Sequence, residues 1–262
     1  MLFRSIVVGA NFAAESDAKN FNALQERGTF TIAQNAFIGP DWWGNSETLE
    51  QMNYRTQDGE FSVGDTMFVG YTSAGAFYQD GGEVSVTNNL LLGLNRADRT
   101  YANRTNAPAL YRIENNGTLS VGGKLQVGGV IDRDCNHDAI FEVVGDNTIT
   151  VGSFELRKHV SPSPRQAGKL KIHIDKSGAF TPIHVNGNIR FDAGTQVFPE
   201  AENGGIPVGE YTLITYEGTL TDYGLELAPE TNDIIWKRFR VNPQEKTVTV
   251  RYAPYPSWII IN

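Results

Sequence analysis

One short acidic segment has residue types and spacing that suit calcium binding. The segment Asp132-Arg-Asp-Cys-Asn-His-Asp138 puts oxygen ligands at alternate positions, with Asp132, Asp134, Asn136 and Asp138 as candidates. Calcium loops use this alternation because Ca²⁺ binds carboxylate and amide oxygens. The segment departs from such a loop at its sixth position, which is His137 rather than Gly, and at its twelfth, which is Val143 rather than Glu. The sequence therefore predicts no obligatory cofactor, with calcium as the one candidate ion.

The same acidic segment leaves an enzymatic alternative open. Acidic side chains with an Arg or Lys partner can perform general acid and base chemistry on polysaccharides. However, no pair of aspartates recurs at the same position of successive repeats, and the four histidines are scattered along the chain. The sequence favours a protein without a catalytic site and does not exclude an enzyme.

Aromatic residues occur in two long segments that interrupt a repeated pattern. Trp42 and Trp43 lie between residues 39 and 57, and Tyr101 and Tyr111 lie between residues 93 and 116. Such rings either stack on sugars or pack beneath the segments that carry them. An outward apolar stripe with Phe37 and Phe68 either marks an interface or is covered by these segments.

The repeated pattern itself determines the expected fold. Four stretches begin and end with glycine, and the opening glycines Gly28, Gly59, Gly82 and Gly117 are 31, 23 and 35 residues apart. A weaker version covers residues 183–191. Each stretch reads as two short strands with alternate apolar residues and a polar turn between them, and a third short strand is expected before each opening glycine. Units of this kind must stack on one another to bury their apolar faces.

We therefore expect an all-β protein in which a right-handed parallel β-helix, or β-solenoid, ends in an antiparallel β cap. The solenoid is assigned to residues 1–200, with irregular later coils and long loop insertions. The cap is assigned to residues 201–262, because an open end would expose strand edges. The inward positions of the first coils are Phe30, Ile32, Ile38, Phe61, Val63, Val69, Val84, Val86, Leu92, Leu119, Val121 and Val127.

Composition narrows the range of partners. The formal net charge of −8 over 262 residues disfavours nucleic acid, which needs clustered Lys and Arg. The single cysteine, Cys135, permits no internal disulfide, and no segment is long and apolar enough to span a membrane. Because residues 6–9 match the closing half of a repeat, we expect the chain to be a fragment of a longer protein.

The repeats resemble those of bacterial surface and secreted β-helix proteins. These include autotransporter passenger domains and Gly-rich repeat proteins of the PEP-CTERM type. The likeness is carried by residues 68–86, by residues 117–128 and by the phrase Gly209-Glu-Tyr-Thr-Leu-Ile-Thr-Tyr-Glu-Gly218. The resemblance implies the right-handed helix, export from the cell and a role in surface structure or adhesion, and it brings no catalytic motif.

The expected function is that of a non-enzymatic structural or adhesive segment located outside the cell or at its surface. Its partner would be a surface glycan, a protein or a second copy of the chain. One alternative is a carbohydrate-binding or lyase-like β-helix, and another is a segment of a phage tail fibre or spike. Solution size and polysaccharide binding distinguish these three functions.

Overall fold

A computed structural model describes residues 2–3, 6–8, 22–39, 52–70, 75–93, 108–129, 138–158, 167–202, 205–231 and 235–254. Throughout these ranges the chain is all-β, as the alternation of apolar residues predicts, and no helix is present. It follows that none of the described segments is a helix that could cross a membrane.

The larger sheet has sixteen strands, most of which lie in two rows. The opening row is β1 (Leu2–Phe3), β4 (Thr29–Ile32), β7 (Glu60–Val63), β10 (Glu83–Val86), β13 (Thr118–Gly128), β15 (Thr148–Arg157), β17 (Ile183–Val185) and β20 (Gly209–Tyr216). The closing row is β2 (Ile6–Val8), β5 (Ala36–Ile38), β8 (Met67–Val69), β11 (Leu90–Leu92), the second halves of β13 and β15, β18 (Ile189–Phe191) and β21 (Leu220–Asp222). Every neighbouring pair within these rows is parallel.

The second sheet has eight strands, and all its neighbouring pairs are parallel. In spatial order they are β3 (Asn22–Gln25), β6 (Met52–Gln57), β9 (Gly75–Asp80), β12 (Ala109–Glu114), β14 (Ala139–Val144), β16 (Gly168–Ile174), β19 (Gln196–Ala201) and β22 (Glu226–Leu227). The third strand expected before each opening glycine is thus present in this sheet.

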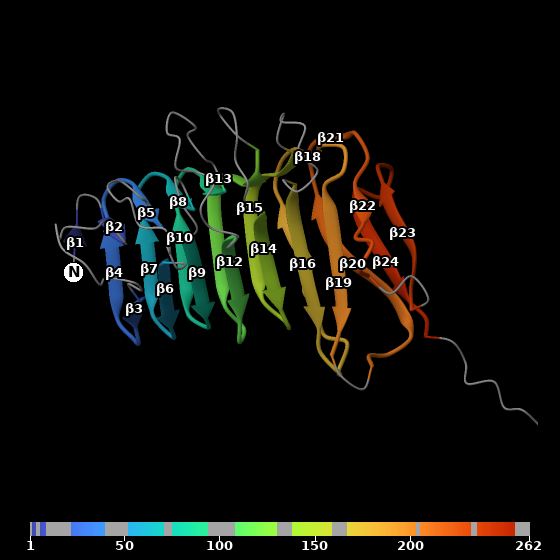
Figure 1. Cartoon of the computed structure of the whole chain (residues 1–262), viewed down its shortest axis with the longest axis horizontal. Coiled ribbons are helices and arrows are strands. Elements are labelled where there is room, and N and C mark those ends of the chain that lie inside the picture. Colours follow the sequence, from blue (N-terminus) through green and yellow to red (C-terminus); the bar gives the residue numbers. More distant parts are fainter. Residues whose placement is uncertain are drawn as a thin grey trace, which may run out of the picture.

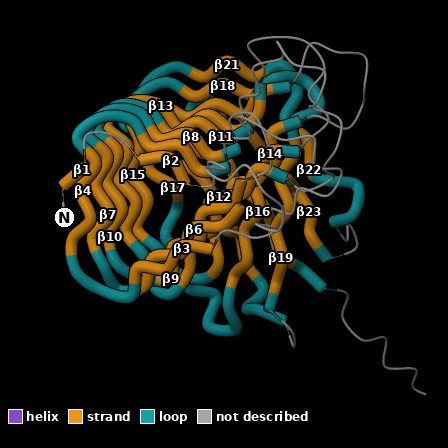
Figure 2. The backbone as a smooth tube through the Cα atoms, turned by 60° about the vertical axis from the view of Figure 1, so that its left-hand side comes forward, coloured by secondary structure: helices purple, strands orange, loops and turns teal. Residues whose placement is uncertain are grey.

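The chain visits the second sheet, the opening row and the closing row in turn, and each circuit lies on the one before it. For example, β6, β7 and β8 pair with β3, β4 and β5 on one side and with β9, β10 and β11 on the other. Figure 1 shows this progression from the blue N-terminal strands to the red C-terminal ones, and Figure 2 shows successive strands as nearly parallel curves. We refer to each circuit as a unit.

Side chains between the two sheets form one continuous core. Nearly all the residues predicted to point inward are buried, and Phe30 is partly buried. Equivalent residues stack from unit to unit, so Phe61 lies beside Val84 and Val84 beside Leu119. Burial of each large apolar side chain stabilises the fold by roughly 1.5–3 kcal/mol. The units therefore stabilise one another along the stack.

Close backbone approach explains a glycine in the turn between the two rows. A Cβ atom on Gly152 would lie 2.4 Å from the Gly122 carbonyl oxygen and 2.5 Å from that of Gly123 in the preceding unit. Gly187 meets the Gly152 oxygen at 2.5 Å in the same way. Only glycine permits this spacing between successive turns.

The antiparallel part of the molecule begins later than the sequence suggested. Strands β20, β21 and β22 still pair in parallel with β17, β18 and β19, so parallel pairing continues to Leu227. Antiparallel pairing occurs in the end hairpin, which comprises β23 (Trp236–Asn242) and β24 (Thr247–Tyr252) and joins the stack through β20. The expected boundary at residue 201 was too early because β20 continues the opening row before it receives β24.

Six connections outside the described ranges share one place in the order of strands. Each joins a strand of the closing row to the next strand of the second sheet, and they are residues 9–21, 40–51, 71–74, 94–107, 130–137 and 159–166. Their different lengths account for most of the uneven spacing of the repeats, while the described strands keep a constant register.

Candidate functional site

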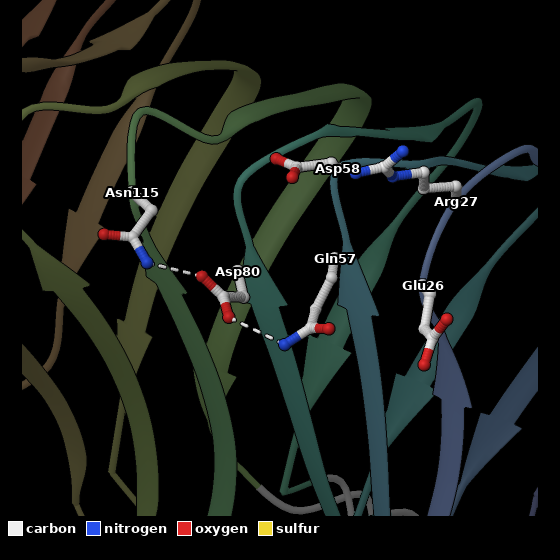
Figure 3. Close-up of a pocket in the computed structure, with 6 residues that line it drawn as sticks. All are labelled: Glu26, Arg27, Gln57, Asp58, Asp80 and Asn115. Carbon is white, nitrogen blue, oxygen red and sulfur yellow. Dashed lines mark hydrogen bonds between the residues drawn. The ribbon is translucent and has the colours of Figure 1, made fainter.

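The first candidate site is a shallow polar groove where strands of the second sheet turn into the opening row. It has a volume of about 520 Å³, and its lining residues are Glu26, Arg27, Gln57, Asp58, Asp80 and Asn115. Asp80 lies between two neighbours in Figure 3: Asn115 donates a hydrogen bond to Oδ1, and Gln57 Nε2 donates one to Oδ2 at 3.1 Å. These contacts join three successive units, so the groove is a repeated surface rather than an enclosed cavity.

Left-handed backbone conformations shape the turns of this groove. Asp58, Asn115 and Asn116 have φ values of 47°, 58° and 58°. Asp and Asn enter this region more readily than other non-glycine residues because their short polar side chains can form local hydrogen bonds. The turn residues therefore follow from backbone geometry and need no ligand to explain them.

The second candidate site is a row of side chains across the outer face of the second sheet. In register from β3 to β19 the row contains Leu24, Arg55, Tyr78, Arg112, Glu142, Lys171 and Phe198. Adjacent members are separated by the strand spacing of about 4.8 Å. Arg55 lies over the Tyr78 ring at 5.4 Å, and the Lys171 ammonium is 5.9 Å from the Phe198 centroid. The row thus carries a cation on an aromatic ring near both of its ends.

A chain of charged contacts occupies the middle of this face. Arg112 Nη1 is 3.6 Å from Glu142 Oε2, and Glu142 Oε1 is 2.7 Å from His173 Nε2. His173 Nδ1 is 2.8 Å from Glu200 Oε2, while Arg112 also pairs with Glu114 at 2.8 Å. Both ring nitrogens of His173 face carboxylates, so the doubly protonated ring can donate to both at once.

The electrostatics of this chain hold its carboxylate in the charged form. Burial by itself raises the pKa of Glu142, but the hydrogen bond and charge of His173 and the charges of Arg112 and Lys171 outweigh it, and the pKa is lowered. Burial by itself lowers the pKa of Arg112, but the hydrogen bond and charge of Glu114 and the charge of Glu142 outweigh it, and the pKa is raised above its ordinary value. A general acid needs a proton near neutral pH. An ionised and fully paired Glu142 therefore suits a structural role better than an acid role.

A second charged network lies in the closing row. Glu155 contacts Lys124 at 3.3 Å and Arg157 at 3.0 Å, and Asp192 contacts Arg157 at 2.8 Å and Arg190 at 2.9 Å. Burial raises the pKa of Asp192, but hydrogen bonds from both arginines and from the Lys158 backbone bring it below the ordinary value. This network joins three successive units, β13, β15 and β18.

The predicted calcium ligands are only partly described. Asp132, Asp134 and Asn136 lie outside the described residues, while Asp138 directly precedes β14. Its Oδ2 atom accepts a hydrogen bond from Lys169 Nζ at 2.8 Å, and Oδ1 is buried with no hydrogen-bond partner among the described residues. No three His, Cys, Asp or Glu side chains within the described ranges lie close enough to hold a metal ion.

Three of the six predicted aromatic site residues, Phe37, Phe68 and Tyr111, lie in the described part of the chain. Trp42, Trp43 and Tyr101 lie outside the described part of the chain. Phe37 and Phe68 stack in adjacent units at 4.8 Å with an interplanar angle of 3° and are partly buried. The assignment of Tyr111 to an insertion was wrong, because it lies in β12, is fully buried and donates a 2.8 Å hydrogen bond to Gln79 Oε1.

Sequence reasoning missed the network around Glu142. Arg112, Glu142 and His173 are 30 and 31 residues apart, close to one repeat length. That spacing was the available signal, but it becomes informative only when the register between units is known. Comparison of the chain with protein-family models, with curated proteins and with solved structures gave no match.

Proposed function

We propose that this chain is a non-enzymatic structural or adhesive segment of a longer bacterial surface protein, built as a right-handed parallel β-solenoid with the end hairpin as its cap. The single observation that carries the proposal is the continuous parallel register through both sheets. Such a register makes a long body whose outer side chains repeat at the strand spacing. Export and the right-handed sense rest on the resemblance of the repeats.

The character of the described surfaces supports binding over a long face. The groove is shallow and repeated, and two weakly exposed carboxylates of the outer faces, Glu142 and Asp192, are engaged in ion pairs. A catalytic site instead requires a concave pocket and an available acid, base or nucleophile. Affinity in this protein would therefore come from many modest contacts along the stack.

Binding to a broad glycan array, with calcium and then with a chelator, tests this proposal, together with product analysis of any bound polysaccharide. A structural or adhesive segment leaves every polysaccharide uncleaved in both conditions. If it binds a glycan, then Arg55→Ala and Lys171→Ala should each weaken binding only modestly. Cleavage products, or loss of all binding through one substitution, would contradict the proposal.

A carbohydrate-active solenoid is the second candidate, and the row of Arg55, Tyr78 and Lys171 favours it. The partly exposed ring of Tyr78 can stack on a sugar, and the two cations can bind acidic sugar groups. Calcium-dependent cleavage that is lost in Asp134→Ala would support this candidate. Calcium-independent binding without cleavage would support the adhesive one.

A further inference from the structure

The described charges are distributed unevenly along the stack. All the ion pairs between described residues involve residues from Arg112 to Glu217, in the middle units. Within residues 22–39, 52–70 and 75–93, no carboxylate forms an ion pair with a described residue. Arg238, Arg240 and Arg251 of the end hairpin also form no ion pair with a described residue. The ion pairs between described residues are therefore concentrated in the middle of the molecule.

The first described units carry the negative excess. Their ranges, 22–39, 52–70 and 75–93, contain six carboxylates and two arginines, a net charge of −4. Glu60 and Glu83 are exposed and occupy directly paired positions on β7 and β10. Like charges that face each other in this way destabilise a sheet. Together with Glu26, Asp58 and Asp80 of the adjoining groove, they form what we call the acidic corner.

The end hairpin carries the opposite excess. Residues 235–254 contain five Lys and Arg residues and one Glu, a net charge of +4 in a chain whose total is −8. Arg238 and Arg240 are exposed on β23, an edge strand that pairs only with β24 among the described strands. Arg238 has a φ of 48° at an irregularity in that pairing, so the edge departs from regular strand geometry there. We call Arg238, Arg240 and Arg251 the basic edge.

Positive residues on an edge strand also prevent unwanted strand pairing, and this accounts for part of the composition of β23. It does not account for the acidic corner, whose carboxylates lie along turns and paired strands rather than at an edge. The two surfaces have opposite sign and lie toward opposite ends of the long axis, as the blue and red ends of Figure 1 show. One surface cannot neutralise the other within a single chain.

We propose that the basic edge of one copy docks on the acidic corner of a second copy, so that the protein associates head to tail. Charge complementarity between two surfaces of the same chain selects a second copy as the partner. Side chains rather than strand pairing would form this contact, because the irregularity at Arg238 disrupts the edge. A contact between two different surfaces leaves one surface of each kind free in a pair, so further copies can add head to tail. This inference is independent of the glycan binding proposed above.

Sedimentation velocity of the whole chain at low and high salt tests the inference. The expected result is concentration-dependent association at about 20 mM salt that is lost at about 0.5 M, because salt screens exposed charges. Arg238→Glu with Arg240→Glu should weaken association at least about tenfold, as should Glu60→Lys with Glu83→Lys. Circular dichroism and the melting temperature establish that each variant is folded. A folded wild-type protein that remains monomeric at low salt would overturn the proposal.

A mixture of the two variants gives the sharpest outcome. The acidic edge of the first variant complements the basic corner of the second, and the unchanged acidic corner of the first complements the unchanged basic edge of the second. The mixture should therefore regain the association that each variant loses on its own. Lys158→Glu with Lys176→Glu makes the same change in net charge at exposed positions of the middle units, and it should leave association intact. Unchanged association of the Arg238/Arg240 variant, or equal loss in the Lys158/Lys176 control, would also overturn the proposal.

Discussion

Replacement of Gly152 by alanine tests how closely the turns of successive units approach. The added methyl group would lie 2.4 Å from the carbonyl oxygen of Gly122 and 2.5 Å from that of Gly123. Both oxygens belong to the backbone of the preceding unit, so neither can rotate away as a side-chain end could. The clash can be relieved only by separation of the units or by distortion of the turn.

The expected cost follows from the size of that displacement. An ordinary contact between carbon and oxygen begins near 3.4 Å, so the backbone must move by about 1 Å to accept the methyl group. Overpacking of a well-packed interior typically costs about 1–3 kcal/mol. Because two backbone atoms are involved, we expect Gly152→Ala to lower the free energy of unfolding by about 2–3 kcal/mol.

Gly145→Asn is the matched control. Gly145 has a φ of 73°, and a Cβ atom there meets nothing within 4 Å. The equivalent position one unit earlier is Asn115, which adopts a φ of 58°. A larger side chain in open space should therefore cost less than about 1 kcal/mol, because Asn accepts this conformation.

Urea unfolding followed by circular dichroism, with both variants measured beside the wild type, is the assay. Gly152→Ala should show the lower midpoint, and Gly145→Asn should unfold close to the wild type. If Gly152→Ala were as stable as the wild type, the successive turns could not approach as closely as described. Similar losses in both variants would indicate a general sensitivity of turns and would also refute the reasoning.

Two further predictions concern buried polar contacts. Tyr111→Phe removes a hydroxyl that hydrogen-bonds to fully buried Gln79, so we expect a loss of about 1–3 kcal/mol in urea unfolding. Tyr54→Phe should cost less, because its partner Gln25 remains accessible to water, and equal costs would contradict this explanation. The pKa of Glu142 is lower in the folded protein, so its contribution to stability is present above its unfolded pKa, near 4.3, and is lost as pH falls through the folded value. Glu142→Gln should therefore lower the melting temperature at pH 7 and have little effect on it near pH 2. An equal lowering of the melting temperature at both pH values would contradict the stabilising role of the ion pairs.

Much of the fold could be predicted because each strand contains its own signal. Alternation in residues such as Phe61 and Val63 identifies the buried face, and the recurring glycines mark the turns. The same reasoning failed for Tyr111, although Ala109, Tyr111 and Ile113 alternate in the same way. That strand follows a long insertion, and the sequence alone did not show where the insertion ends.

The charged networks were not predictable from local pattern. Arg112 and His173 meet the same carboxylate, of Glu142, only because the units stack with a particular register. The total charge of the chain also concealed the positive end hairpin, since a sum does not show where opposite charges lie. Such features depend on contacts between units, and these require the three-dimensional arrangement.

Hydrogen exchange of the amides tests most directly the claim that all units belong to one stack with a shared core. The account predicts strong protection in the central strands β10, β13 and β15, which have a parallel neighbour on each side. It further predicts that Gly152→Ala lowers protection in the neighbouring strands β13 and β18 as well as in β15. Protection that falls only in β15, or that divides the chain into independently opening blocks, would contradict the claim.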